Sequence, residues 1–408
     1  MSSTAMQGFS EVAKQALMQP QESLQKPKHK KQELVIAIPR ETSFQEKRIA
    51  ITPSSVEVLV SNGHEVHVEA GAGEGARFSD KKYSDAGAKI IYDRTALFQS
   101  DILMKVAPPS MAEIELMKPG QTLISALNLA SLKDETIKAL MNKKLTALGY
   151  EYLKDEDGSF MVVRSMSEIV GNTAILIAAE YLSNSKHGKG MMFGGVTGIP
   201  STEVVILGAG TVGEFAARAA LALGCEVKVF DDSLYRLRRL LSSLNQRVFT
   251  SVIQPKVLLK ALKTCDVAIG AIRAKNGSVP CVVSEEMVAQ MPADSIVIDV
   301  SIDQGGCFET SHVTNHDNPV FLKNNVIHYG VPNIASRVAR TASYALTNIF
   351  TPILTDIGDH GGIKNMLWNK AGVRHGVYIY QGHLTNKYLG EQFNLPFKDL
   401  DLLVAAQV

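Results

Sequence analysis

The clearest indication of the fold comes from the segment Val204-Val-Ile-Leu-Gly-Ala-Gly-Thr-Val-Gly213. Its apolar residues, typical of a buried parallel strand, lead into three glycines in the spacing Gly-x-Gly-x-x-Gly. A helix is predicted from Glu214 to Leu223, and a second predicted strand, Val227–Phe230, is followed by Asp231. This order of strand, glycine turn, helix, strand and acid predicts a dinucleotide-binding βαβ unit.

Each residue type in this unit has a physical reason. Gly208 permits the tight turn from strand to helix, and Gly210 has no Cβ, so that a pyrophosphate can approach the backbone. Gly213 lets the helix pack closely on the strand, and the helix N-terminus offers free N–H groups to the phosphates. The carboxylate of Asp231 suits ribose hydroxyls and repels a 2′-phosphate, a charge that Arg236 offsets only in part. We therefore expect NAD rather than NADP as the cofactor.

Strand-like and helix-like segments alternate on both sides of this unit. The apolar run Leu34–Ile38 predicts a buried strand, Pro53–Val60 predicts a helix, and Glu65–Glu69 alternates like a further strand. The pattern restarts after a long helix predicted from about Ser167 to Leu182. Such alternation predicts an α/β protein of two Rossmann-like doubly wound domains with a cleft between them, the NAD domain being inserted into the substrate domain.

The domain boundaries expected from this pattern are a flexible tail over residues 1–32, a substrate domain over 33–160 plus 341–408, and an NAD domain over 161–340. The tail is polar and ends in a short basic cluster. Its composition is that of a solvated, partly disordered segment rather than a signal peptide.

Composition excludes several classes of protein. The chain has 408 residues, of which 45% are hydrophobic and 20% charged, so that disorder of the whole chain is excluded. A formal net charge of +1 gives no support to nucleic-acid binding, and no apolar run is long enough to predict a membrane partner. The four cysteines form no C-x-x-C pair, which argues against a metal site and favours a reducing, cytoplasmic compartment.

Several long blocks resemble one known family. They are Ile38-Pro-Arg-Glu41, Glu46-Lys-Arg48-Ile-Ala-Ile-Thr-Pro53, Ser165-Met-Ser-Glu168, Ile302-Asp-Gln-Gly-Gly-Cys-Phe-Glu309 and Thr341-Ala-Ser-Tyr-Ala-Leu-Thr-Asn348. The chain is similar, from about Glu33 onward, to alanine dehydrogenases and to the NAD-binding part of proton-translocating transhydrogenases, and most of all to the former. A transhydrogenase component is not expected, since the segment 155–164 lacks the glutamine of that branch.

The resemblance implies a function and a set of site residues. It implies NAD-dependent conversion of L-alanine and water to pyruvate and ammonia, in a homo-oligomer that is a hexamer or a dimer. Arg48 matches the carboxylate-binding arginine, and Asp303 matches the catalytic aspartate that orients the attacking water or the amine. Ser167 and Asn333 match positions on the cofactor side.

Two positions depart from the family pattern. Ala107 stands where the family has its substrate-binding lysine, and Asn128 stands where it has its catalytic histidine. Lys105, two residues earlier in a predicted strand, is on the same face as Ala107 and is a candidate replacement for substrate binding. Asn128 can hydrogen-bond a substrate but cannot exchange a proton near neutral pH. Two alternatives therefore stay open, an NAD-binding sensor with weakened catalysis and a dehydrogenase for another amino or keto acid.

Overall fold

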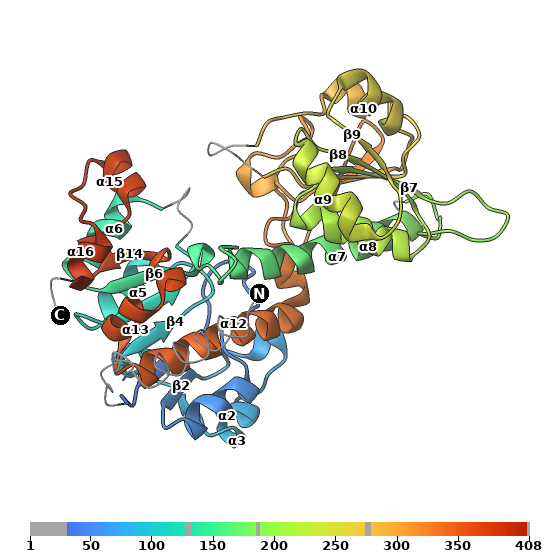
Figure 1. The fold of residues 1–408 in the computed structure, drawn as a ribbon. Coiled ribbons are helices and arrows are strands. Elements are labelled where there is room, and N and C mark those ends of the chain that lie inside the picture. The colour runs from blue at the N-terminus through green and yellow to red at the C-terminus, as the bar shows by residue number, and fades with distance from the viewer. Residues whose placement is uncertain (1–30, 128–131, 185–187, 274–278, 406–408) are drawn as a thin grey trace, which may run out of the picture.

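The computed structural model describes residues 31–127, 132–184, 188–273 and 279–405. Two sheets form two lobes, joined by the long helices α7 (Met161–Ser183) and α12 (Ala339–Asp359) (Figure 1). The second sheet is built entirely from chain between these two helices, whereas the first sheet takes strands from both ends of the chain. The predicted insertion of one α/β domain into another is confirmed, and the predicted boundary residues stay a prediction.

The first sheet has eight strands in the order β15-β14-β6-β5-β4-β1-β2-β3. The strands in chain order are β1 (Val35–Ile38), β2 (Glu65–Glu69), β3 (Lys89–Ile91), β4 (Ile102–Met104), β5 (Thr122–Ser125), β6 (Thr146–Gly149), β14 (Val377–Tyr380) and β15 (His383–Leu384). β1 to β6 are parallel, while β14 pairs antiparallel with β6. The order 3-2-1-4-5-6 of the parallel strands is that of a doubly wound nucleotide-binding sheet.

Helices cover both faces of the first sheet. They are α2 (Pro53–Ser61), α3 (Asp80–Asp85), α4 (Arg94–Leu97), α5 (Met111–Leu116), α6 (Asp134–Asn142), α12, α13 (Ile363–Asn369), α14 (Ala371–Arg374), α15 (Lys387–Phe393) and α16 (Leu400–Ala405), with short 3₁₀ turns η1 (Glu74–Ala76) and η2 (Tyr150–Tyr152). Along β1, Ile36 and Ile38 face one apolar core and Ala37 faces another. This burial on both faces explains why the strand reads as a continuous apolar run.

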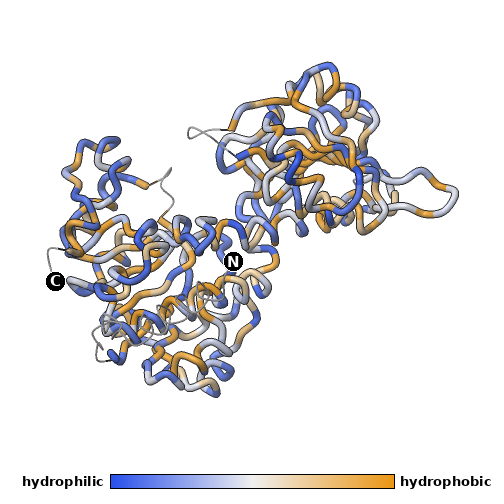
Figure 2. The backbone as a smooth tube through the Cα atoms, viewed as in Figure 1, coloured by the Kyte–Doolittle hydropathy of each residue, from blue (hydrophilic) through white to orange (hydrophobic). Residues whose placement is uncertain are grey.

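The second sheet repeats the same order with seven strands, β12-β13-β11-β10-β7-β8-β9. Its strands are β7 (Glu203–Leu207), β8 (Glu226–Phe230), β9 (Phe249–Ser251), β10 (Val267–Gly270), β11 (Ile296–Asp299), β12 (Val320–Lys323) and β13 (Val326–Tyr329), and only β12 is antiparallel to its neighbour. The helices are α8 (Thr211–Ala222), α9 (Leu234–Leu244), α10 (Pro255–Leu262) and α11 (Glu285–Val288), with 3₁₀ turns η3 (Ile302–Gln304) and η4 (Ile334–Val338). The apolar residues gather inside this lobe along its strands (Figure 2).

Helix α7 has the length and hydropathy of a membrane span, and among the described helices it alone passes that test. It carries Arg164, Glu168 and Glu180, and it packs against α8, α12 and η4. Ala174 and Ile175 lie in the core shared with the second sheet. Packing between the two lobes therefore explains the apolar character of this helix.

Candidate active site

A cavity of about 650 Å³ lies where the carboxyl ends of the two sheets face each other. Segments that follow β4, β5 and β6 line it from one lobe, and segments that follow β10 and β11 line it from the other. Helix α7 crosses the cavity wall with Met166, Ser167 and Val170. Ligands of doubly wound sheets bind at the carboxyl ends of the strands, near the point where the strand order reverses. The cavity has that location in both sheets.

The predicted glycine turn joins β7 to α8. Gly208 has φ of 110°, a conformation that favours glycine, and a Cβ there would lie 2.4 Å from the carbonyl oxygen of Ala271. A Cβ on Gly213 would lie 1.9 Å from the carbonyl oxygen of Gly208. A Cβ on Gly210, by contrast, would meet nothing within 4 Å. Gly208 and Gly213 are thus required by the fold, while the open space at Gly210 is room for a ligand beside the N-terminus of α8.

Asp231 lies directly after β8, at the end of the glycine turn. Its Oδ2 accepts a hydrogen bond of 2.8 Å from the backbone N–H of Ala209, and its Oδ1 accepts one of 2.7 Å from the backbone N–H of Ser233. Arg236 Nη1 lies 3.7 Å from Oδ2. These contacts hold the carboxylate against the turn. The residues present therefore fit a dinucleotide with free ribose hydroxyls.

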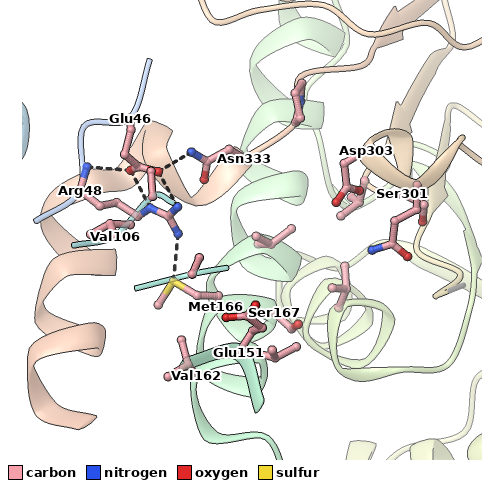
Figure 3. Close-up of a pocket in the computed structure, with 18 of the residues that line it drawn as sticks. Glu46, Arg48, Val106, Glu151, Val162, Met166, Ser167, Ser301, Asp303 and Asn333 are labelled. Carbon is pink, nitrogen blue, oxygen red and sulfur yellow. Dashed lines mark hydrogen bonds and ion pairs between the residues drawn. The ribbon is translucent and has the colours of Figure 1, made fainter. Parts of the chain in front are cut away.

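Arg48 lines the cavity from the first lobe and is paired with Glu46. Its Nε donates to Glu46 Oε1 at 2.8 Å and its Nη2 donates to Oε2 at 2.6 Å, a bidentate pair (Figure 3). Burial opposes the charge of Arg48, but the hydrogen bonds and charge of Glu46 outweigh it and raise the pKa of the guanidinium. Burial likewise opposes ionisation of Glu46, and Arg48 outweighs it and lowers the pKa of that carboxyl. Both side chains are therefore charged in the folded protein.

Asn333 connects this pair to the second lobe. It follows β13, adopts φ of 56°, and its Nδ2 donates to Glu46 Oε2 at 2.9 Å. Gln45 makes two further contacts across the lobes, since its Nε2 donates to Asp317 at 2.9 Å and its Oε1 accepts the N–H of His316 at 2.7 Å. The turn that carries Glu46 is thus hydrogen-bonded to the lobe that carries the glycine turn.

Asp303 and Ser167 line the same cavity. Asp303 belongs to the turn η3 after β11, and Figure 3 shows it across the cavity from Arg48, with Ser167 on the helix between them. Asp303 is exposed to the cleft. The surrounding protein nevertheless limits the hydration of its carboxyl group, and this desolvation raises the pKa of that group above its usual range. A carboxyl of raised pKa holds or releases a proton more readily near neutral pH than an ordinary aspartate.

Lys105 does not reach the cavity, so its predicted part in substrate binding is corrected. Its fully buried Nζ lies 3.0 Å from Glu41 and 3.0 Å from Glu113, and Ala107 is the residue that lines the cavity. The two-residue repeat of a strand no longer holds here because β4 ends at Met104. Lys105 instead neutralises two buried carboxylates, and Glu41 accepts the backbone N–H of Val106.

Asn128 lies outside the described residues. No histidine belongs to the described cavity lining, and His328 is buried in the second sheet with its Nε2 2.8 Å from Thr310. Tyr150 and Glu151, which follow β6, line the cavity. The Tyr150 hydroxyl donates to the carbonyl of Val106 at 2.6 Å, and burial raises the pKa of this phenol.

Two charged residues of the described lining, Glu46 and Arg273, were not predicted as site residues from the sequence. Glu46 pairs with Arg48 across a turn, a contact that depends on side-chain conformation rather than on strand periodicity. Arg273 follows β10 at the carboxyl end of the second sheet. Its position shortly after the apolar run Val267–Ile269 was the sequence signal that could have indicated this residue.

Two doubly wound sheets, a glycine turn of the kind that binds phosphates and a cavity between the lobes define the class of two-domain dinucleotide-binding proteins. Comparison with known sequences identifies the family. The family model described as "Alanine dehydrogenase/PNT, N-terminal domain" matches residues 37–170, and that described as "Alanine dehydrogenase/PNT, C-terminal domain" matches residues 174–387. The chain belongs to the alanine dehydrogenase/PNT family, whose members are NAD-dependent.

Individual relatives agree over almost their whole length. The chain is 38% identical over 366 residues to an alanine dehydrogenase of Methanococcus maripaludis, covering 89% of this chain and 98% of the relative. It is 35% identical to alanine dehydrogenase 2 of Staphylococcus aureus, covering 90% of this chain and 98% of the relative.

Solved structures give the same result for the fold. An L-alanine dehydrogenase structure superposes with a TM-score of 0.82 at 34% identity, covering 88% of this chain and 99% of that one. A transhydrogenase from Sinorhizobium meliloti superposes with a TM-score of 0.75 at 24% identity, covering 87% and 99%, and shares the fold. The predicted two-domain α/β architecture is confirmed.

Proposed function

We propose that this chain is an NAD-dependent L-alanine dehydrogenase. The reaction is L-alanine, water and NAD⁺ to pyruvate, ammonium, NADH and a proton. The observation that carries the proposal is the meeting of Arg48, Asp303, Ser167 and Asn333 in one cavity beside the glycine turn. The names of the relatives support the amino-acid substrate.

Arg48 is the proposed anchor of the substrate carboxylate. Nε and Nη2 are held by Glu46, so Nη1 is the terminal nitrogen left to face the cavity, where it lies 3.6 Å from Met166 Sδ. A guanidinium fixed in this way donates to a carboxylate without first losing side-chain freedom. Ala107, on the same wall, offers only a methyl group.

Asp303 is the proposed residue for proton transfer. Its raised pKa suits a group that orients water and takes a proton as that water attacks an imine carbon. NAD⁺, when bound at Gly208, Gly210, Gly213 and Asp231, supplies the hydride acceptor for the substrate Cα. Asn333 lies close to Glu46 and is proposed to fix the nicotinamide side of the cavity while it joins the two lobes.

The two alternatives are less well supported. An NAD sensor needs neither a carboxylate-binding arginine nor an aspartate in the cavity, and both line it. Ala107, which stands in place of the family's substrate-binding lysine, is the observation that supports a different amino or keto acid as the substrate. We further propose a cytoplasmic homo-oligomer, a hexamer or a dimer, on the resemblance to the family.

Steady-state formation of NADH with a panel of amino acids tests the function. The proposal requires L-alanine to give the highest kcat/KM, with turnover in the ordinary enzymatic range of about 1–10³ per second. A higher kcat/KM with another amino acid would assign the site to that substrate. Tight NADH binding without turnover of any amino acid would assign the chain to the sensor class.

A further inference from the structure

The cavity has few cations with which to attract an anionic substrate. Its described lining has three carboxylates, Glu46, Glu151 and Asp303, and two guanidinium groups, Arg48 and Arg273. Glu46 neutralises Arg48 through the bidentate pair. A carboxylate that enters the cavity therefore meets a surplus of negative charge, and Arg273 is the other guanidinium of the described lining that reduces this surplus.

Arg273 is the lining cation whose donors are free within the described part of the chain. It follows β10, its residue is exposed, and none of the described residues forms a hydrogen bond or ion pair with it. Its guanidinium carbon lies 5.8 Å from the centroid of the Phe160 ring, at the start of α7. A contact with the face of an aromatic ring holds the guanidinium group weakly and does not use its N–H groups, which can therefore donate to a ligand.

The location of Arg273 favours the substrate over the cofactor phosphates. The phosphates have their own donors at the N-terminus of α8, beside the open space at Gly210. Arg273 shares its cavity with Asp303 from the same lobe and with Arg48 and Ala107 from the other lobe. Ala107 carries no charge. The second cation for a substrate carboxylate therefore comes from Arg273, in the lobe opposite Arg48.

We propose that Arg273 is the second carboxylate-binding residue of this site. It binds the carboxylate of the 2-amino or 2-oxo acid from the second lobe, while Arg48 Nη1 binds it from the first. This inference rests on the proposed function, since it names a substrate contact of the same site. It makes substrate binding dependent on both lobes, so that a carboxylate bridges them when bound.

Calorimetric titration of pyruvate into the enzyme–NADH complex, without ammonium, tests the inference as a binding equilibrium. Arg273→Gln is expected to raise the Kd of pyruvate about 10- to 100-fold, the usual effect of one charged hydrogen bond, and to change the Kd of NADH less than about twofold. Arg273→Lys, which keeps the charge, is expected to recover most of the affinity. Arg247→Gln, a change at an exposed arginine outside the cavity, is the matched control and is expected to bind pyruvate like the wild type.

An unchanged Kd for pyruvate in Arg273→Gln would overturn the inference. An equally large loss of NADH affinity in Arg273→Gln would also overturn the inference, because it would assign Arg273 to the cofactor. Failure of the wild type to bind pyruvate would overturn it as well. Turnover separates this test from the proposed function. A wild type that oxidises alanine while Arg273→Gln binds pyruvate normally contradicts the inference alone, whereas pyruvate binding that depends on Arg273 without alanine turnover contradicts the proposed function alone.

Discussion

Arg48 donates two parallel hydrogen bonds to Glu46, from Nε at 2.8 Å and from Nη2 at 2.6 Å. The side chains of Arg48 and Glu46 are 13% and 4% exposed, so each charge depends on the other in a largely buried site. Asn333 donates to the same carboxylate from the second lobe. This pair therefore fixes the proposed substrate anchor and also connects the two lobes.

Removal of one member of this pair is expected to destabilise the fold. Arg48→Met leaves Glu46 charged and unpaired, at a cost of about 3–5 kcal/mol in the free energy of unfolding. The double variant Glu46→Gln with Arg48→Met removes both charges and is expected to recover a large part of that loss. Urea unfolding of the wild type, both single variants and the double variant measures the coupling. Losses of stability in the two single variants that simply add up to the loss in the double variant would show that the pair is not coupled.

Gly210→Val is expected to abolish cofactor binding and to leave the fold intact. Gly210 has φ of −76°, and a Cβ at this residue would have open space around it. Valine therefore fits the backbone, and its side chain fills the space that we propose for the phosphates. We expect the Kd of NADH to rise by roughly 100-fold or more, about 2.7 kcal/mol. Fluorescence titration with NADH and circular dichroism measure the two effects.

Gly213→Val is the matched contrast at the same turn. Its side chain would collide with the carbonyl of Gly208, so it is expected to lower stability rather than only cofactor affinity. Loss of the fold in Gly210→Val, or full NADH affinity in it, would contradict the assignment of this turn to the cofactor.

The site is expected to bind NADH more tightly than NADPH. Asp231 is held against the turn by the N–H groups of Ala209 and Ser233, where its charge repels a 2′-phosphate. Asp231→Asn keeps the shape of the side chain and removes the charge, so the preference for NADH is expected to fall about tenfold. Asp232→Asn, at the exposed neighbouring acid, serves as the control and should keep the wild-type preference. Equal or tighter NADPH binding by the wild type would contradict this role of Asp231.

Buried His328 is expected to make the fold sensitive to acid. Burial lowers the pKa of His328 to about 4 from its usual value near 6.5, and its Nε2 lies 2.8 Å from the Thr310 hydroxyl. The unfolded chain therefore binds a proton between pH 6.5 and 4 that the folded chain does not. This contribution is fully present above pH 6.5 and is lost as the pH falls toward 4, by up to about 3 kcal/mol.

Thermal unfolding across this pH range measures the effect. His328→Gln is expected to be less stable than the wild type at pH 7, but its stability should fall less between pH 6.5 and 4.5. His383→Gln, at an exposed histidine, is expected to keep the wild-type slope. A His328→Gln slope identical to that of the wild type would contradict the low pKa.

Much of the fold was predictable because burial leaves a strong signal in parallel strands. Val204 and Ile206 face one core while Val205 and Leu207 face the other, so the strand before the glycine turn is apolar throughout. Strand ends were less predictable. The strand rule placed Lys105 beside Ala107, but β4 ends earlier and Lys105 pairs with buried carboxylates instead.

The site was predictable only in part. Arg48 and Asp303 came from long family-like blocks, and the structure brings both to one cavity. The pairing of Arg48 with Glu46 depends on the conformations of two side chains in a turn, and hydrophobic periodicity does not predict these conformations. Arg273 stands at a strand end where a lining residue is expected, but one arginine after one strand is not distinctive without the arrangement of the second lobe.

Product stoichiometry shows whether this cavity oxidises L-alanine. The purified full chain is supplied with L-alanine and NAD⁺, and NADH is followed by absorbance while pyruvate is determined in the same sample. We expect equal amounts of NADH and pyruvate, no product with D-alanine, and loss of both products in Asp303→Asn. NADH binding with no pyruvate formed, or pyruvate formation unaffected by Asp303→Asn, would contradict this expectation.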